Sequence, residues 1–448
     1  MEMIRQLKKI GNEDPRRVVH SIKVGLSLTL VSLLYYFRPL YDGFGQAGMW
    51  AILTVVVVSE FTVGGTLSRS LNRSVATLVA GGLGVGVEYF SGLFGEKGEP
   101  VVLGLLVFTL AAGSTFVRFF PKVKGRYDYG VLIFILTFSL VAVSGVRVSE
   151  ILKLAHQRLS TILIGGVTCI LVSLCICPVW AGQDLHNLTA SNIGNLALFF
   201  QGLADEFDDN SGVSTKEGDK KINSYLQSPT SVLNSKATEE SLANFAWWEP
   251  CHGEFKFNHP WQQYLKVGCA TRDCAYKIQA LCVCINNFNT IIINYKSSSQ
   301  GASSSSSSSS DKFAPLFVKI SREVSSFLKE LAAAMKDMRV PNPINSSSSS
   351  SMKNLSTAAA DEVRAIYLML SEKVGVEEIL PLLVISSLLL DIINSLDKVA
   401  LLVRQLSLKG GFRKPNLPQK LQSNCDHVVV EIHSLEAARN TTTQSQTQ

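Results

Sequence analysis

The chain has 448 residues; 46% of them are hydrophobic, 17% are Asp, Glu, Lys or Arg, and the formal net charge is +6. The basic residues are not interleaved with aromatic residues along one face, which excludes a nucleic-acid groove, and no nucleophile with a neighbouring base suggests an enzyme. Val, Leu, Ile, Phe and Gly dominate residues 18–183, whereas residues 184–448 carry most of the Ser, Asn, Asp and Lys. This division predicts a transmembrane domain over 1–183 and a soluble domain over 184–448.

The first domain contains six apolar runs, each about long enough to cross the roughly 30 Å hydrocarbon core of a bilayer. The runs are 18–37, 47–64, 74–93, 101–119, 129–146 and 159–180. Glycines lie inside several runs, as at 81–86 and 165–166, and between membrane helices such residues let backbones approach closely. The expected fold is an all-α membrane protein with six transmembrane helices followed by a cytosolic helical bundle.

The distribution of Lys and Arg predicts the orientation, because these residues favour the cytosolic side of a membrane. They gather before the first run and in the second loop, which holds Arg69 and Arg73. The fourth loop holds a basic rim formed by Arg118, Lys122, Lys124 and Arg126. The other loops hold fewer basic residues and mix them with acids. We therefore expect both termini to face the cytosol.

Amphipathic helices are expected in the second domain, at roughly 184–208, 259–296, 312–338, 353–373, 377–409 and 418–437. Residues 379–402 are apolar enough to suggest a seventh span, but Asp391, Asp397 and Lys398 interrupt them and favour a helix of the cytosolic bundle. The serine runs at 297–310 and 346–351 cannot bury enough apolar area to order themselves. We interpret them as flexible linkers.

The 9 cysteines follow no CxxC pattern, and three of them lie in the last apolar run. Reduced thiols are the simplest interpretation. Cys251 with His252 and His259 lacks four ligands at zinc spacing, so neither a metal nor a cofactor is expected.

Two opposite charges lie inside the first two runs, Lys23 in the first and Glu60 in the second. Because these runs cross in opposite directions, the two residues have similar depths. A charge without a partner in hydrocarbon costs roughly 3 kcal/mol on insertion scales, so we expect Lys23 and Glu60 to pair or to share a water-filled cavity. The pair is either a structural link between the first two spans or part of a gated pore wall.

Two arginines stand next to long apolar runs: Arg73 opens the third and Arg158 opens the sixth. A guanidinium stays charged and presents a planar fork of donors that matches a carboxylate. Two such groups converging on a pore would attract anions and reject cations, whereas two interface residues would instead extend their charged heads to water. The basic rim has three interpretations: it concentrates anions at a pore mouth, satisfies the orientation bias, or contacts anionic lipid.

Several motifs along the chain carry a resemblance to one known family. Those of the apolar half are Asp14-Pro15-Arg16-Arg17-Val18-Val19-His20, Met49–Gly86, Ser114–Pro121, Tyr129–Phe138, Arg158-Leu159-Ser160-Thr161 and Cys177–Gly182. In the polar half, Trp248-Glu249-Pro250 is similar to the cytosolic signature of the family, as are His259-Pro260-Trp261 and Tyr264–Gly268. These motifs resemble the plant aluminium-activated malate transporter family of anion channels. The resemblance covers nearly the whole chain except the serine runs and the last residues.

The resemblance implies a homodimer with a central pore that passes malate and other anions across the lipid bilayer. Two family pore arginines fall on Arg73, in Leu71-Asn72-Arg73, and on Arg158, in Arg158-Leu159-Ser160. The short N-terminal segment resembles that of plasma-membrane members, so the plasma membrane is expected, with a vacuolar or other endomembrane as the alternative.

The sequence thus predicts an anion channel that passes malate and inorganic anions, mainly outward, through a pore lined by Arg73, Arg158 and Lys23. Two alternatives belong to other classes. One is a proton-coupled organic-anion exporter with Glu60 or Glu88 as the proton carrier. The other is a non-conducting regulatory membrane subunit.

Overall fold

The computed structural model describes residues 2–33, 48–145, 151–208, 227–256, 258–298, 307–341 and 376–413. These residues form helices, with two isolated β-bridges and no strand among them, as the all-α expectation requires. The chain divides into two compact units: unit 1 comprises Met1–Leu185 and Glu240–Trp261, and unit 2 comprises His186–Glu239 and Gln262–Gln448. The Trp248-Glu249-Pro250 signature, predicted in the soluble domain, therefore belongs to the same unit as the apolar helices.

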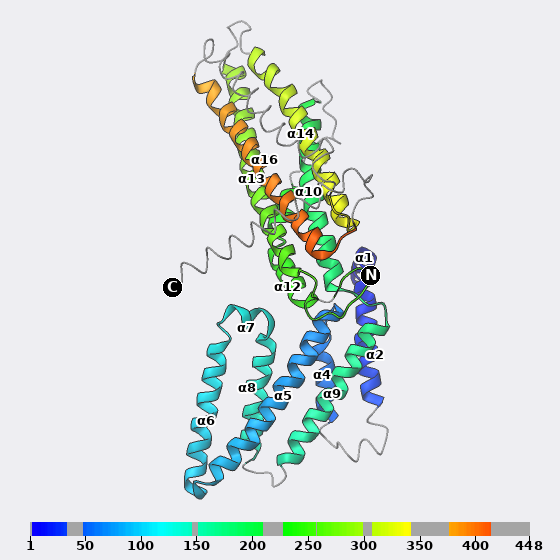
Figure 1. Ribbon diagram of the computed structural model, residues 1–448, viewed down its shortest axis with the longest axis vertical. Helices are drawn as coiled ribbons and strands as arrows, with labels where there is room; N and C mark the ends of the chain where they lie inside the picture. Colours follow the sequence, from blue (N-terminus) through cyan, green and yellow to red (C-terminus); the bar gives the residue numbers. More distant parts are fainter. Residues whose placement is uncertain are drawn as a thin grey trace, which may run out of the picture. The chain divides into compact units, whose positions relative to one another are not determined.

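Unit 1 is built from long apolar helices, with α6 and α8 antiparallel and joined by the short α7 (Figure 1). The helices are α1 (Glu2–Glu13), α2 (Pro15–Leu33), α4 (Met49–Val58), α5 (Val63–Gly92), α6 (Gly95–Val117), α7 (Pro121–Arg126), α8 (Asp128–Gly145) and α9 (Ile151–Cys175). The start of α2 follows from its sequence: Pro15 suits a first helical position, and Asp14 Oδ1 accepts a hydrogen bond from the Arg16 N–H at 3.1 Å.

The turn between α4 and α5 is shorter than predicted. The third apolar run was expected from 74, but α5 begins at Val63, so Arg69 and Arg73 lie on a helix rather than in a loop. Thr62 explains the early start, because its extended backbone and its hydroxyl, which accepts from the Gly65 N–H at 3.1 Å, form an N-cap. The predicted turn at Arg69 and Arg73 is therefore wrong.

Small residues bring these helices close together, as expected for membrane helices. A Cβ atom on Gly84 would stand 2.7 Å from Val141 on α8, and one on Gly165 would stand 2.7 Å from the Ala51 carbonyl oxygen on α4. By contrast, a Cβ on Gly82 or Gly86 would meet nothing within 4 Å. Only some glycines of the two predicted clusters therefore serve close packing.

Three helical segments in the described part of the chain are long and apolar enough to cross a bilayer: Val63–Gly92, Lys97–Val117 and His156–Cys175. Met49–Val58 and Asp128–Val143 are shorter apolar helices. Large apolar side chains along α6 are exposed, among them Val101, Leu105 and Phe108, which is typical of a lipid-facing helix. Residues 34–47, which include the end of the first predicted span and the start of the second, lie outside the described residues, and the count of six spans stays a prediction.

Unit 2 is a bundle in which four long helices, α10, α13, α14 and α16, lie beside one another (Figure 1). The helices outside the first group are α10 (Ala181–Asp208), α12 (Lys236–Ala246), α13 (Trp261–Ser298), α14 (Ser307–Lys336) and α16 (Val376–Gly410). The division between the units falls within α10, after Leu185. Four of the predicted helices correspond to α10, α13, α14 and α16; those at 353–373 and 418–437 lie outside the described residues.

The linker predicted at 297–310 is partly helical, because α13 continues to Ser298 and α14 begins at Ser307. Helices already nucleated by packed neighbours extend into serine more easily than serine alone starts one. The serine run at 346–351 lies outside the described residues.

The α16 helix packs in the bundle of unit 2. Ile392, Leu396 and Val399 are buried, and Asp391 forms an ion pair of 3.2 Å with Lys277 of α13. The apolar residues of α16, which suggested a seventh span, are therefore buried within unit 2, and its charged side pairs with α13.

A buried carboxylate, Glu239, joins three segments of unit 2. Its Oε1 atom accepts hydrogen bonds from Asn192 at 3.0 Å and from Ser235 at 2.8 Å, and its Oε2 atom pairs with Arg272. The residue is 1% exposed. Both oxygens of the Glu239 carboxylate thus have donors. A buried charge is tolerated when it is paired and hydrogen-bonded in this way.

Candidate functional site

Arg73 lies well inside α5, about 15 Å from the Val63 end at 1.5 Å per residue. The residue is buried, with 3% of its surface exposed. Its Nη1 atom donates a hydrogen bond to Tyr129 Oη at 3.3 Å, and its Nε atom is buried without a hydrogen-bond partner. No carboxylate of the described residues forms an ion pair with it. Among the described residues, the positive charge of this guanidinium is therefore not neutralised by an acid.

Arg158 has a different neighbour. It lies on α9, is 9% exposed, and its Cζ atom stands 4.4 Å from the ring centroid of Trp50 on α4. Its Nε atom is also buried without a hydrogen-bond partner. Arg73 and Arg158 are thus both buried cations, one held against α8 and the other against α4.

Lys23 and Glu60 do not form the predicted ion pair. Lys23 is 6% exposed, and its Nζ atom donates a hydrogen bond to the Cys177 carbonyl oxygen at 3.0 Å. Glu60 pairs instead with Arg69, which also donates to the Val57 carbonyl oxygen at 3.2 Å. The early start of α5 explains the exchange, because it places Arg69 on the helix that follows Glu60.

Three members of the predicted basic rim lie on α7, Arg118 comes just before it, and the four have different surroundings. Arg118 is neutralised by Asp128 through two hydrogen bonds, of 2.7 and 3.0 Å. The Cζ atom of Arg126 stands 4.1 Å from the ring centroid of Trp247, whereas Lys122 and Lys124 are exposed. Only the two lysines therefore present exposed ammonium groups.

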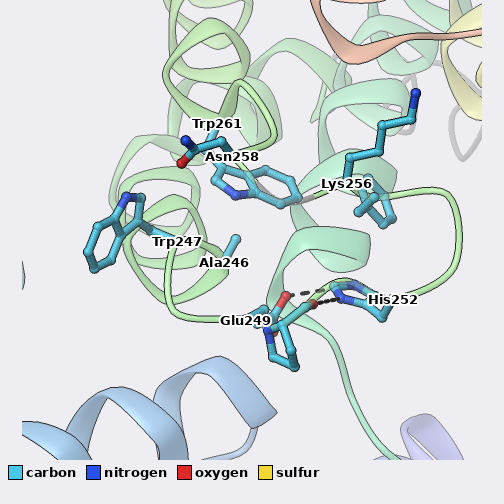
Figure 2. A pocket seen from close by; sticks show the side chains of 9 residues that line it. Ala246, Trp247, Glu249, His252, Lys256, Asn258 and Trp261 are labelled. Atoms are coloured by element: carbon cyan, nitrogen blue, oxygen red, sulfur yellow. Dashed lines mark hydrogen bonds and ion pairs between the residues drawn. The ribbon is translucent and has the colours of Figure 1, made fainter.

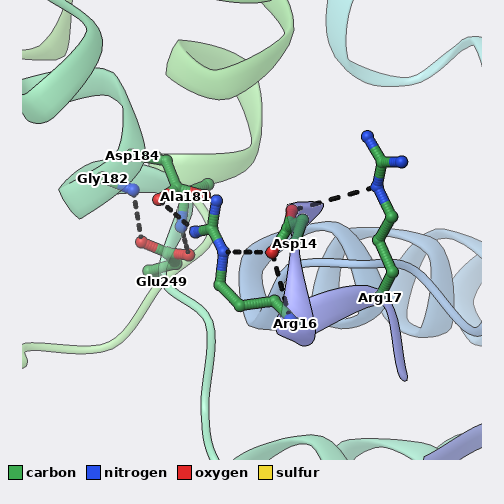
Figure 3. Close-up of polar contacts among 7 residues, drawn as sticks. All are labelled: Asp14, Arg16, Arg17, Ala181, Gly182, Asp184 and Glu249. Atoms are coloured by element: carbon green, nitrogen blue, oxygen red, sulfur yellow. Dashed lines mark hydrogen bonds and ion pairs between the residues drawn. The ribbon is translucent and has the colours of Figure 1, made fainter. Parts of the chain in front are cut away.

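The signature residue Glu249 holds two helix N-termini together. Its Oε1 atom accepts a hydrogen bond from the N–H group of Gly64 at 3.2 Å. Figure 3 shows the other two contacts: Oε1 accepts from Ala181 at 2.6 Å, and Oε2 accepts from Gly182 at 3.0 Å. These N–H groups belong to the first turns of α5 and α10. N–H groups of a first turn lack acceptors within their own helix and carry partial positive charge. The Glu249 carboxylate thus links the N-termini of α5 and α10. We call its contacts with Gly64, Ala181 and Gly182 the clasp.

The clasp needs glycine at two of these positions. A Cβ on Gly64 would overlap the Phe245 carbonyl oxygen, and one on Gly182 would overlap the Trp261 ring. Arg16 adds a second link to α10 through an ion pair of 2.9 Å with Asp184 (Figure 3). Sequence reasoning gave Glu249 only as part of a family signature; the glycines were the available signal of its backbone contacts.

The other signature residues support this clasp. The Trp248 ring packs edge-on against Tyr127, with centroids 6.1 Å apart, and the Pro250 carbonyl oxygen lies 2.9 Å from His252 Nδ1. The His252 ring stacks on Trp180 at 3.9 Å, and its Nε2 atom lies 3.8 Å from Glu249 Oε2. The signature therefore connects α7 and α8 with the starts of α5 and α10.

A small cavity of about 140 Å³ borders this cluster, and Glu249, His252, Trp247 and Trp261 are among its lining residues (Figure 2). Burial raises the pKa of Glu249 to about 7, against the opposing effect of its three N–H donors. Burial also lowers the pKa of His252. A neutral His252 donates from Nδ1 to the Pro250 carbonyl and turns its unprotonated Nε2 toward Glu249.

Comparison with known proteins agrees with this architecture. The family model described as aluminium activated malate transporter matches residues 8–371. Aluminum-activated malate transporter 2 of Arabidopsis thaliana is 46% identical, over 98% of this chain and 87% of the relative. Aluminum-activated malate transporter 1 of the same plant is 43% identical, over 98% and 89%. Aluminum-activated malate transporter 1 of Triticum aestivum is 42% identical, over 91% and 86%.

These relatives are named as transporters and not as enzymes. With the apolar helices of unit 1, they show that the chain is a membrane protein. The chain belongs to the aluminium-activated malate transporter family.

Proposed function

We propose that the protein is an anion channel that passes malate and inorganic anions along a path containing Arg73, Arg158 and Lys23. One observation carries the proposal: all three cations are buried, and none has a carboxylate partner among the described residues. A buried charge without a counter-ion is costly, roughly 3 kcal/mol in a membrane helix, and is found mainly where it serves an ion path. A permeating anion supplies the missing counter-charge.

Other arginines of unit 1 give the contrast. Arg69 is neutralised by Glu60 and Arg118 by Asp128, so each belongs to a structural ion pair. Arg69 and Arg118 are therefore neutralised by acids of the same unit. At Arg73 and Arg158 the partners are a phenol and an indole, which leave the positive charge in place.

The names of the relatives support malate as a permeant anion. With both termini cytosolic in the plasma membrane, as we propose, a negative cell interior drives anions outward. Moving one negative charge outward across the membrane is favoured by about 2.3 kcal/mol per 100 mV, and moving a malate dianion by about twice that. Net efflux is the expected direction, and the exposed Lys122 and Lys124 would raise the anion concentration at the inner mouth.

Neutralising the buried arginines tests the path. In whole-cell recordings with malate as the main anion, we expect Arg73→Gln and Arg158→Gln to remove most of the current. Arg17→Gln, at an exposed arginine on α2, should conduct like the wild type and is the matched control. Surface labelling checks that each variant reaches the membrane. Wild-type current in both buried variants would refute the arginine-lined path.

A proton-coupled exporter is the second candidate, since Glu88 Oε2 is buried without a hydrogen-bond partner. The reversal potential separates the two functions. For a channel it follows the anion gradient alone, and for an exporter it also shifts when a pH gradient is imposed. A regulatory subunit would give no malate current when the chain is expressed alone.

A further inference from the structure

Trp50 is the residue that holds Arg158. The guanidinium carbon stands 4.4 Å from the indole centroid, and no hydrogen-bond acceptor for the Arg158 side chain is found among the described residues. Trp50 lies in the first turn of α4, next to Ala51, whose carbonyl oxygen would stand 2.7 Å from a Cβ on Gly165 of α9. The close approach of these two helices fixes the indole against the arginine.

An aromatic face holds a guanidinium differently from a carboxylate. The Asp128 carboxylate occupies two N–H groups of Arg118 and cancels its charge. A ring attracts the cation through its quadrupole, carries no net charge, and leaves the N–H donors at the rim of the guanidinium plane. Arg158 is thus held in place while its donors remain available.

We propose that Trp50 is a positioning residue for anion recognition: its indole face orients Arg158 so that the guanidinium fork meets the carboxylate of a permeating dicarboxylate. This inference rests on the proposed function, in which Arg158 contacts the anion. A fork that is held rigid favours a planar carboxylate, which accepts two parallel hydrogen bonds, over a spherical chloride. Trp50 therefore sets malate affinity and the preference for malate over chloride.

Fluorination of the ring tests the contact without changing its shape. Tryptophan analogues with one to four ring fluorines are incorporated at position 50 by nonsense suppression in oocytes. Each fluorine withdraws electron density from the ring face and weakens its attraction for a cation. We expect the half-saturating malate concentration to rise with each fluorine, to about tenfold with four, as the loss of a desolvated cation–π contact predicts. The malate-to-chloride permeability ratio should fall in parallel.

Trp247 provides the matched control, because its ring contacts Arg126 at 4.1 Å, a cation outside the proposed path. The same analogues at Trp247 should leave malate affinity unchanged. A merely structural Trp50 would tolerate all its fluorinated forms, so a flat series at position 50 would overturn the inference.

The Arg158→Gln variant separates this result from the proposed function. If Arg158→Gln loses the malate current while the series at position 50 is flat, only the role of Trp50 is refuted. If Arg158→Gln conducts malate like the wild type, the proposed path through Arg158 fails, whatever the series shows.

Discussion

At the residue scale, the surroundings of Glu249 favour its protonated form. Glu249 Oε1 accepts two backbone N–H groups, as a carbonyl oxygen does, and Oε2 faces the unprotonated Nε2 of His252. Burial disfavours the charged forms of both side chains, and the nearby Asp184 carboxylate disfavours a second negative charge on Glu249. The neutral form of Glu249 is therefore favoured below about pH 7.

This arrangement predicts that stability depends on pH. The pKa of Glu249, about 7 when folded, lies above the usual 4.5, so the folded protein binds the proton more tightly than the unfolded chain. The contribution to the free energy of unfolding is complete below pH 4.5, falls as the pH rises to 7, and is absent above it. The change is about 3 kcal/mol, from 1.36 kcal/mol per pKa unit. Thermal unfolding of the purified protein between pH 5 and 8 measures it.

Glu249→Gln should flatten this pH profile, because an amide does not titrate. The substitution should also lower the melting temperature at acid pH. The glutamine side chain has an NH2 group, which cannot accept a hydrogen bond from the backbone N–H that it would face, and the lost bond costs about 1–3 kcal/mol. Glu240→Gln, at an exposed glutamate, is the control and should keep the wild-type profile. An unchanged profile in Glu249→Gln would assign the pH dependence to another group.

At the element scale, the start of α5 depends on Gly64. Alanine there would push its methyl group into the Phe245 carbonyl and against Glu249, so the helix or the segment carrying the clasp must move. We expect Gly64→Ala to lower stability by about 1–3 kcal/mol, as overpacking of a tight contact does, and to reduce current. Gly82→Ala lies on the same helix in open space and should be neutral. Melting curves and recordings on both variants compare the two positions.

Within unit 2, Glu239 holds α10, α12 and α13 through Asn192, Ser235 and Arg272. Glu239→Leu leaves the partly buried Arg272, with 12% of its side chain exposed, and the buried Asn192 without their acceptor, and should destabilise the unit by about 3 kcal/mol. Replacing both partners, as Glu239→Leu with Arg272→Leu, should recover part of the loss. Glu240→Leu, at the adjacent exposed position, should have little effect. Equal melting temperatures for Glu239→Leu and Glu240→Leu would contradict the network.

Sequence periodicity located most helices because apolar runs and amphipathic stretches are local signals. It misplaced the start of α5, since an N-cap threonine and two arginines read as a turn when Thr62 is not recognised as a cap. From depth alone it predicted that Lys23 and Glu60 pair or share a water-filled cavity, whereas the partners of each residue also depend on helix rotation. The roles of Trp50 and Glu249 needed tertiary contacts between segments far apart in sequence, which no local pattern contains.

At the scale of the whole molecule, buried cations without acids predict rejection of cations. In asymmetric NaCl, the reversal potential should stay near the chloride equilibrium potential, because Na⁺ meets an electrostatic barrier along the path. A shift toward the sodium equilibrium potential in the wild type would contradict the proposal. Arg73→Gln should move the reversal potential in that direction if residual current remains.

The homodimer that the family resemblance implies makes a separate prediction. The purified protein, corrected for bound detergent, should have twice the 48.9 kDa mass of one chain. Multi-angle light scattering measures this directly. A mass of a single chain in a preparation that conducts malate after reconstitution would refute the dimer.

The discontinuity of unit 1 has a consequence for synthesis. The chain leaves this unit after Leu185 and re-enters it at Glu240, so Glu249 emerges from the ribosome long after the helices whose ends it clasps. Until then, the N–H groups of Gly64, Ala181 and Gly182 lack the Glu249 carboxylate that accepts their hydrogen bonds in the folded unit. The clasp therefore forms late in the maturation of unit 1. A nascent chain that stops before Glu249 lacks it.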